Sequence, residues 1–88
     1  MIEKNVTIVN KAGMHTRPAS MLVKIASKYK SDFYIIKDGY SINAKSIIGV
    51  MSLAAECGST VTLKFDGPDE EKASQEIIKY FEDGFGEL

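Results

Sequence analysis

The apolar and polar positions of the chain alternate with two different periods, which predicts strands and helices in turn. The β-branched stretch Val6–Val9 predicts a first strand, followed by a loop over residues 10–13. Apolar residues then recur with the spacing of one face of a helix, at Ala19, Leu22, Val23 and Ala26. A first helix is therefore predicted to run roughly from Thr16 to Lys28.

Pro18 indicates where this helix begins. Proline lacks an N–H group, so it fits the first turn of a helix, where no intrahelical acceptor exists. The start of the helix must then lie close to His15, which we expect at the N-cap or just before it.

The middle of the chain predicts a hairpin and a short helix. The pair Asp38-Gly39 suits a two-residue turn between the strand-forming runs Phe33–Lys37 and Tyr40–Asn43. Ser46 then stands in N-cap position before a short apolar run that ends at Leu53. A helix of about two turns is expected there, because helix propensity is low at the glycine within the run.

The last third of the chain predicts one more strand and one more helix. Apolar and polar residues alternate over Thr60–Phe65, the clearest strand pattern in the chain. Three acids, Asp69-Glu70-Glu71, open the last helix, and Gly84 ends it. The order βαββαβα favours the α+β class, with an antiparallel sheet that carries helices on one face.

Length and charge limit the kinds of protein this chain can be. Its 88 residues suffice for one domain, expected to span 1–88, and 44% hydrophobic residues are enough for a core. A net charge of −1 offers no basic field for nucleic acid or an anionic membrane. No apolar run approaches the length of a membrane span, so we expect a cytoplasmic protein without membrane insertion.

Cysteine and metal-ligand patterns exclude two kinds of framework. Cys57 is the only cysteine, so no intrachain disulfide can form, and we expect it to be buried or half-buried. No cluster of residues has the spacing of a zinc site. The sequence therefore predicts neither a bound metal nor a cofactor.

His15 and Arg17 are the residues that point most directly to chemistry. They are the only histidine and the only arginine, although ten lysines could have supplied the positive charge. Imidazole can form a covalent phosphoramidate, and the planar fork of arginine matches phosphate oxygens. The pair suits reversible phosphoryl transfer, while a solvated histidine beside a surface arginine is the alternative interpretation.

The helix starts favour the phosphoryl interpretation. A helix start carries partial positive charge and usually attracts acids, as Asp69-Glu70-Glu71 do in the last helix. The first helix has no acid in the segment Thr16, Arg17, Pro18, so its start is predicted to be open to an anion. A phosphate on His15 would meet those free N–H groups and Arg17.

The short helix carries a second candidate site. Ser46 is explained by its capping role alone, but a phosphate there would also be stabilised by the helix start and would change the charge of the surface. The helix is too short to bury all of its apolar residues. We expect Val50 and Leu53 in the core and an exposed patch made of Ile47, Ile48 and Met51.

Two separate motifs resemble the HPr family of histidine-containing phosphocarriers, which belong to the phosphoenolpyruvate-dependent sugar phosphotransferase system. Gly13 to Ala19, GMHTRPA, is similar to the active-centre motif of the family, and Lys45 to Leu53, KSIIGVMSL, is similar to its regulatory-serine segment. The resemblance covers essentially the whole chain. Ala54 departs from it, because glycine is frequent there in the serine-regulated branch.

The resemblance implies a fold and a function. The fold is an open-faced β-sandwich in which a four-stranded antiparallel sheet is covered by three helices. The chain would accept a phosphoryl group from enzyme I on Nδ1 of His15, with Arg17 neutralising the phosphate, and pass it to sugar-specific IIA domains. It would act as a carrier, without turnover of its own and without a cofactor, and as a monomer.

The resemblance also implies regulation and docking. Ser46 would be the target of HPr kinase/phosphorylase, and a catabolite-control transcription factor is a further candidate partner. The docking surface would include Ser20, Ile47, Ile48 and Met51. Two alternatives stay open: a mainly regulatory HPr-like protein with little transport flux, and a small ligand- or RNA-binding module without covalent chemistry.

Overall fold

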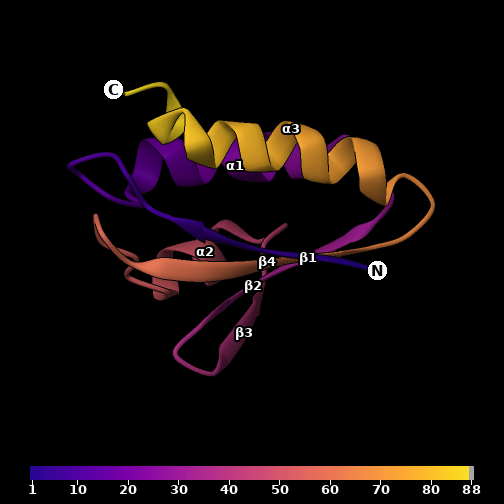
Figure 1. Ribbon diagram of the computed structural model, residues 1–88, viewed down its shortest axis with the longest axis horizontal. Coiled ribbons are helices and arrows are strands. Elements are labelled where there is room, and N and C mark those ends of the chain that lie inside the picture. The colour runs from indigo at the N-terminus through magenta and orange to yellow at the C-terminus, as the bar shows by residue number, and fades with distance from the viewer. Residues whose placement is uncertain (88) are drawn as a thin grey trace.

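The computed structural model describes residues 1–87 and shows a four-stranded antiparallel sheet with helices on one face (Figure 1). This architecture confirms the predicted α+β class and the open-faced sandwich. The strands are β1 (Ile2–Thr7), β2 (Asp32–Lys37), β3 (Tyr40–Asn43) and β4 (Thr60–Asp66). The helices are α1 (Thr16–Ser27), α2 (Ile47–Ser52) and α3 (Glu70–Glu82), followed by the 3₁₀ turn η1 (Gly84–Gly86).

Strand β4 lies inside the sheet, whose order is β1-β4-β2-β3. It pairs antiparallel with β1 and with β2, and this register brings Phe65 opposite Phe33. The two rings stack with centroids 4.7 Å apart. Val61, Leu63 and Phe65 are all buried, as their alternation predicts, because every second residue of a strand faces the same side.

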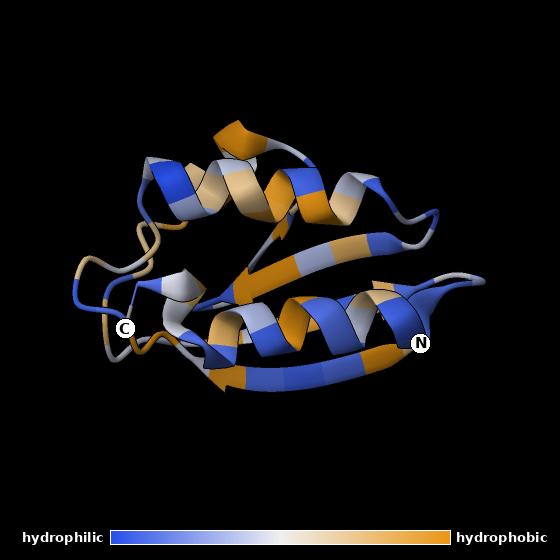
Figure 2. Cartoon of the chain, turned by 90° about the horizontal axis from the view of Figure 1, so that it is seen from above, coloured by the Kyte–Doolittle hydropathy of each residue, from blue (hydrophilic) through white to orange (hydrophobic). Residues whose placement is uncertain are grey.

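Helices α1 and α3 lie side by side over the sheet and bury their apolar stripes against it (Figures 1 and 2). Leu22 of α1 and Ile77 of α3 are fully buried, and Phe81 is 1% exposed. The short helix α2 packs beside α1 and contributes Val50 and Leu53 to the core, as expected. The positions of both functional segments are therefore fixed by one continuous core.

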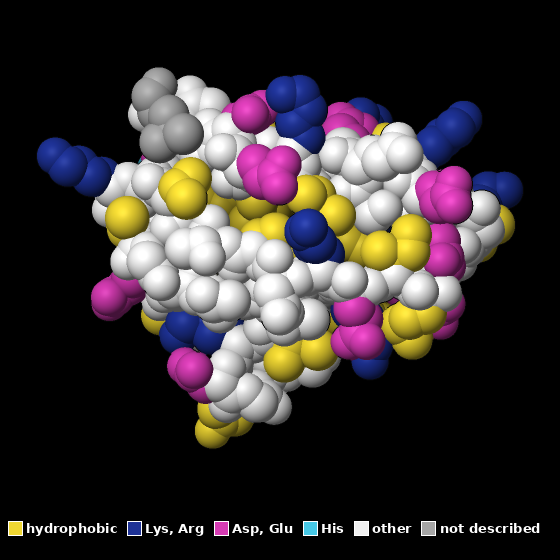
Figure 3. Space-filling view, viewed as in Figure 1, with side chains coloured by type: hydrophobic (Ala, Val, Ile, Leu, Met, Phe, Trp, Pro, Cys, Tyr) yellow, Lys and Arg dark blue, Asp and Glu magenta, His cyan; other side chains and the backbone are white. Residues whose placement is uncertain are grey.

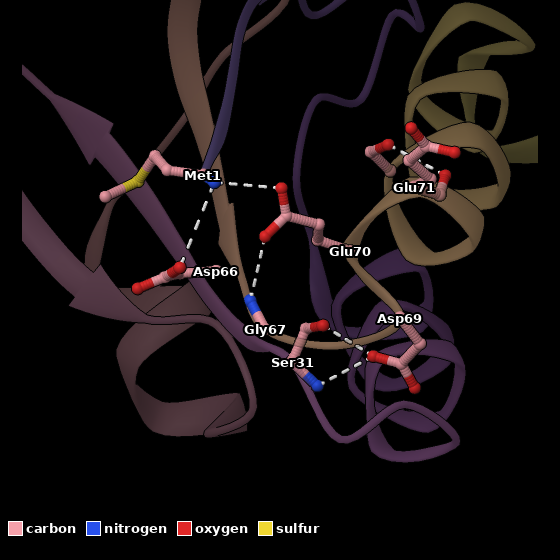
Figure 4. A network of polar contacts seen from close by, with 8 residues as sticks. Met1, Ser31, Asp66, Gly67, Asp69, Glu70 and Glu71 are labelled. Carbon is pink, nitrogen blue, oxygen red and sulfur yellow. Dashed lines mark hydrogen bonds and ion pairs between the residues drawn. The ribbon is translucent and has the colours of Figure 1, made fainter.

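Carboxylates at the start of α3 tie together three parts of the chain (Figure 4). Asp69 accepts hydrogen bonds from the backbone N–H of Lys30 and of Ser31, each at 2.9 Å. Glu70 accepts from Gly67 N–H at 3.0 Å and from the Met1 ammonium at 2.9 Å. The Ser31 hydroxyl and the backbone amides of Lys30 and Ser31 hold the pKa of Asp69 at about 2.

Two element boundaries differ from those predicted. The first strand is Ile2–Thr7 instead of Val6–Val9, because β1 pairs only with β4 and leaves its outer edge in solvent, where polar residues are tolerated. The backbone of Ile8 still bonds to Ser59 and Gly58 beyond the strand. Helix α1 ends at Ser27, one residue before the predicted end, and Lys28 caps it.

The side chain of Cys57 also lies elsewhere than expected. Cys57 is exposed, and the prediction of a buried or half-buried thiol is wrong, because this residue lies in the turn before β4 and not in the core. Tyr34 lies on the open face of the sheet. Tyr40 shares the other face with Ile42 and lines a pocket next to Leu53.

Candidate functional site

The loop before α1 is held in place by a close backbone contact. Gly13 has φ of +70°, and a Cβ atom there would lie 2.7 Å from the carbonyl oxygen of Ala55. The next amide, that of Met14, donates to the same oxygen at 2.8 Å, and the Met14 side chain is buried. Only glycine permits this approach, so the backbone that leads into His15 is fixed on both sides.

His15 is the N-cap residue of α1. Its backbone is extended, and its carbonyl oxygen accepts the first helical hydrogen bond, from Ala19 N–H at 3.0 Å. Within residues 1–87 the amides of Thr16 and Arg17 donate to no acceptor, and Pro18 has no N–H group. The imidazole is 38% exposed, so a partner protein can reach it.

A carboxylate from the C-terminal end of the chain binds both site residues. Oε2 of Glu87 lies 2.8 Å from Nε2 of His15 and 2.8 Å from Nη2 of Arg17. Oε1 of Glu87 accepts from Nδ2 of Asn10 at 2.7 Å. The Glu87 side chain is 14% exposed, whereas that of Arg17 is 80% exposed.

Glu87 corrects the prediction that the start of α1 lacks an internal anion. No acid lies in the first turn of the helix, as the sequence indicates. The side chains of His15 and Arg17 nevertheless bind a carboxylate that is 72 residues away from His15 in the chain. Among the described residues 1–87, the backbone amides of Thr16 and Arg17 are the part of the site that stays unpaired.

The charges around Glu87 lower its pKa. The Arg17 guanidinium, with further hydrogen bonds from Asn10 and His15, holds the pKa of the Glu87 carboxyl at about 2. Burial, together with the nearby Glu87 charge, raises the pKa of the Tyr80 hydroxyl. Glu87 is therefore ionised near neutral pH and can only accept hydrogen bonds.

Ser46 caps α2, as its position predicts. Its hydroxyl accepts from Gly49 N–H at 3.3 Å, and the residue is exposed. At the other end of α2, Ala54 adopts φ of +50°, in the left-handed region that favours glycine.

The exposed surface beside the site is apolar. Ile48 is 80% exposed, and Ile47 and Met51 are each 38% exposed, while Ser20 is exposed on the neighbouring α1. Figure 2 shows α2 as a strongly hydrophobic short helix beside α1. Met21 of α1, 45% exposed, belongs to the same pair of helices and was absent from the predicted surface.

The described surface shows no other site of comparable chemistry. Residues 1–87 hold no group of three or more His, Cys, Asp or Glu side chains that could bind a metal ion. No helix in that range is long and apolar enough to cross a membrane. On the face in Figure 3, basic and acidic side chains are interspersed and form no block of one sign.

Sequence reasoning missed Asn10 and Glu87. Asn10 reads as an ordinary loop residue, yet it is only 1% exposed, and its Nδ2 also donates to the Gly13 carbonyl at 2.9 Å. Glu87 follows the glycines of η1, and nothing in its local pattern connects it with His15. Met21 did leave a signal, because it is an apolar residue outside the buried stripe of α1.

Comparisons with known proteins agree on one family. The family model described as the phosphorylation site of the PTS HPr component matches residues 2–83. The phosphocarrier protein HPr of Treponema pallidum is 44% identical over 87 residues, covering 99% of each chain. The HPr-like protein Crh of Halalkalibacterium halodurans is 45% identical over 82 residues, covering 93% of this chain and 98% of that protein.

A solved structure matches equally well. The crystal structure of HPr-C-His from Thermoanaerobacter tengcongensis superimposes with a TM-score of 0.95 at 43% identity, covering 100% of this chain and 99% of that one. Both the sequence and the fold match over essentially the full length. The chain therefore belongs to the HPr family, the phosphocarrier component of the phosphotransferase system.

Proposed function

We propose that this protein accepts a phosphoryl group on Nδ1 of His15 from phosphorylated enzyme I and passes it to sugar-specific IIA domains. The observation that carries the proposal is the position of His15, a half-exposed N-cap residue beside Arg17 and two unpaired amides. Unpaired N–H groups at a helix start bind phosphate oxygens, and a guanidinium binds them in a planar fork.

The chemistry asked of the protein is positioning and charge stabilisation. The lone pair of Nδ1 attacks phosphorus, an N–P bond forms, and the bond between phosphorus and the donor breaks. Arg17 and the amides of Thr16 and Arg17 then balance the phosphate charge. Because the group is passed on unchanged, the protein acts as a carrier without independent turnover.

The partners are proposed to dock on the apolar surface beside His15. Ser20 and Met21 of α1 and Ile47, Ile48 and Met51 of α2 are exposed on adjacent helices. Exposed apolar groups of this kind mark protein interaction sites, and methionine side chains adapt to several partners. We expect a cytoplasmic monomer that binds enzyme I and the IIA domains in turn through this one surface.

Incubation with enzyme I and phosphoenolpyruvate tests the carrier function directly. Intact-mass measurement should show one added phosphoryl group that is lost in acid and that does not form in His15→Ala. Ser46→Ala is the matched control and should be modified like the native chain. A native chain that gains no acid-labile group would contradict the carrier proposal.

We further propose that Ser46 is a regulatory site for HPr kinase/phosphorylase. Its exposed hydroxyl lies at a helix start next to the proposed docking surface, where a phosphate would add negative charge beside Ile47 and Ile48. Kinase and ATP should add an acid-stable group that is absent in Ser46→Ala. A catabolite-control transcription factor is the further partner expected for that form.

The charge on Ser46 is expected to weaken docking of enzyme I. Ser46→Asp should slow phosphorylation of His15, whereas Ser41→Asp, which adds the same charge to exposed β3, should not. Equal rates for Ser46→Asp and the native chain would count against regulation through this site.

A mainly regulatory protein is the second candidate function. It is favoured by the 45% identity to an HPr-like protein named Crh, as high as the identity to proteins named phosphocarriers. This candidate predicts efficient modification of Ser46 with little transfer from His15 to any IIA domain. The ratio of acid-labile to acid-stable phosphate in cells, measured by intact mass, distinguishes the two.

A further inference from the structure

The C-terminal turn is built to bring Glu87 to the acceptor histidine. Phe85 in η1 is 6% exposed and packs edge-on against Phe81, with ring centroids 5.0 Å apart, and against Tyr80 at 5.2 Å. Its φ of +59° lies in the left-handed region, which is costly for a side chain of this size. The turn therefore holds a fixed conformation that places Glu87 two residues further on.

The contact between Glu87 and His15 determines where the imidazole carries its proton. An ionised carboxylate has no hydrogen to donate, so the 2.8 Å contact requires a hydrogen on Nε2. A neutral imidazole has only one ring hydrogen. With that hydrogen on Nε2, the lone pair that can attack phosphorus lies on Nδ1.

We propose that Glu87 is a positioning residue that fixes the Nε2–H tautomer of His15 and so presents Nδ1 as the nucleophile. The inference rests on the proposed role of His15 as the phosphoryl acceptor. Glu87 would act like the aspartate of a hydrolase triad, which holds the catalytic histidine in one tautomer and orientation. Here the oriented nitrogen is itself the nucleophile and activates no other group.

Asn10 holds the carboxylate in this arrangement. Its buried side chain donates from Nδ2 to both Glu87 Oε1 and the Gly13 carbonyl, at 2.7 and 2.9 Å. Its Oδ1 is buried and has no hydrogen-bond partner within residues 1–87. Rotating the amide by half a turn would place Oδ1 against two acceptors, so the observed orientation is the one that binds a carboxylate.

Glu87 also faces the charge that develops in the reaction. When Nδ1 attacks, the N–P bond to the donor breaks and its electron pair stays on the donor, while the His15 ring keeps its Nε2 proton and becomes cationic. The carboxylate at Nε2 stabilises that cation from the edge of the ring opposite the phosphorus. Arg17, 80% exposed, retains N–H donors for the phosphoryl oxygens.

Nitrogen-15 NMR of His15 tests the tautomer without any partner protein. In the native chain, at a pH of about 8.5 where imidazole is neutral, Nε2 should appear protonated and Nδ1 bare. In Glu87→Ala both signals should move toward averaged values, because both tautomers become populated. Glu87→Gln should retain most of the native pattern, since its amide oxygen can still accept from Nε2–H.

Phosphoryl transfer from enzyme I gives the second readout. Glu87→Ala should lower the rate at saturating enzyme I roughly tenfold, the lower end of the loss found when the partner that orients a functional imidazole is removed, with the half-saturating concentration unchanged. Glu87→Gln should lie between, because it keeps the orientation but loses the charge. Glu82→Gln removes the same charge from an exposed position of α3 and should match the native chain in both readouts.

The outcomes separate this inference from the proposed function. Native tautomer signals in Glu87→Ala, or a rate equal to or faster than the native rate, would overturn the role of Glu87 and leave the carrier function intact. A native chain that is never phosphorylated would overturn the carrier function, and the NMR comparison would still decide whether Glu87 fixes the tautomer.

Discussion

The starts of α1 and α3 both carry partial positive charge, and each has a carboxylate nearby, but the two carboxylates come from different parts of the chain. Helix α3 has acids at its own start, and Asp69 and Glu70 bond mainly to backbone N–H groups of neighbouring segments. Helix α1 has none, and its anion, Glu87, comes from the far end of the chain and is bound by side chains of Asn10, His15 and Arg17. The start of α3 is therefore occupied by acids of its own segment, whereas the start of α1 stays accessible to another anion.

The two carboxylates have similar acidity for different reasons. Both Asp69 and Glu87 have a pKa of about 2. The Ser31 hydroxyl and backbone amides lower the first, while Arg17 and the Asn10 amide lower the second. Backbone donors cannot move away without unfolding, but a guanidinium can rotate toward an incoming phosphate. The start of α3 therefore has a structural role, whereas the start of α1 can exchange its carboxylate for a phosphate.

Removing the guanidinium should affect function most strongly. Arg17→Ala should slow phosphorylation of His15 by enzyme I roughly 10²–10³-fold, the usual effect of losing one donor to a developing anion. Arg17→Lys should recover only part of the rate, because an ammonium lacks the planar fork. Rates at saturating enzyme I measure this effect.

The acids of α3 supply the control for this experiment. Asp69→Asn changes the other helix start and should leave the rate at saturating enzyme I unchanged, provided that the assay temperature lies below its unfolding transition. A similar loss of rate in Asp69→Asn and Arg17→Ala would contradict the separation of the two starts.

Releasing the C-terminal turn should remove Glu87 from the start of α1. Phe85→Ala removes a nearly buried ring at the edge of the core and should lower the free energy of unfolding by about 3 kcal/mol, the lower end for a buried phenylalanine. Glu87 would then lose its fixed position. Its carboxyl pKa, followed by carbon-13 NMR, should rise from about 2 toward its ordinary value near 4.5.

Phe85→Leu is the matched variant for this prediction, since it keeps most of the apolar volume. It should be more stable than Phe85→Ala and keep the low pKa of Glu87. A low pKa retained in Phe85→Ala would mean that Asn10 and Arg17 hold the carboxylate without help from the turn.

These two regions also mark how far the sequence predicts the structure. The order of elements, the N-cap position of His15 and the core residues Val50 and Leu53 follow from local periodicity and capping, and the structure confirms them. The contact between His15 and Glu87 spans 72 residues, and its formation depends on the packing of Phe85 against α3. No local pattern encodes such a contact.

Removing the charge of Asp69 at the start of α3 should lower the stability of the protein and change how that stability depends on pH. Asp69→Asn should lower Tm by roughly 10 °C, because several hydrogen bonds to an ionised carboxylate are lost. The pKa of Asp69 is depressed to about 2, so its stabilisation is complete above about pH 4 and disappears as pH falls through 2. The stability difference between native and variant should therefore shrink over that interval.

Thermal unfolding followed by circular dichroism between pH 7 and pH 2 measures this difference. Asp38→Asn, an exposed acid in the hairpin turn, is the control and should change Tm little. A Tm difference between native and Asp69→Asn that stays constant down to pH 2 would show that the ionised carboxylate of Asp69 does not supply the stabilisation.

The start of α2 is capped by the neutral hydroxyl of Ser46. Removing this cap should give the smallest loss of stability among these variants. Ser46→Ala removes the acceptor of Gly49 N–H and should lower the free energy of unfolding by about 1 kcal/mol, the usual loss for an N-cap. Ser46→Asp should retain most of that stability, because aspartate caps helices as well as serine does. Urea unfolding of both variants separates the capping role of Ser46 from its proposed regulatory role. A variant that is stable yet phosphorylated slowly at His15 has altered docking. A variant that loses both stability and the rate of phosphorylation has lost the helix that presents Ile47 and Met51.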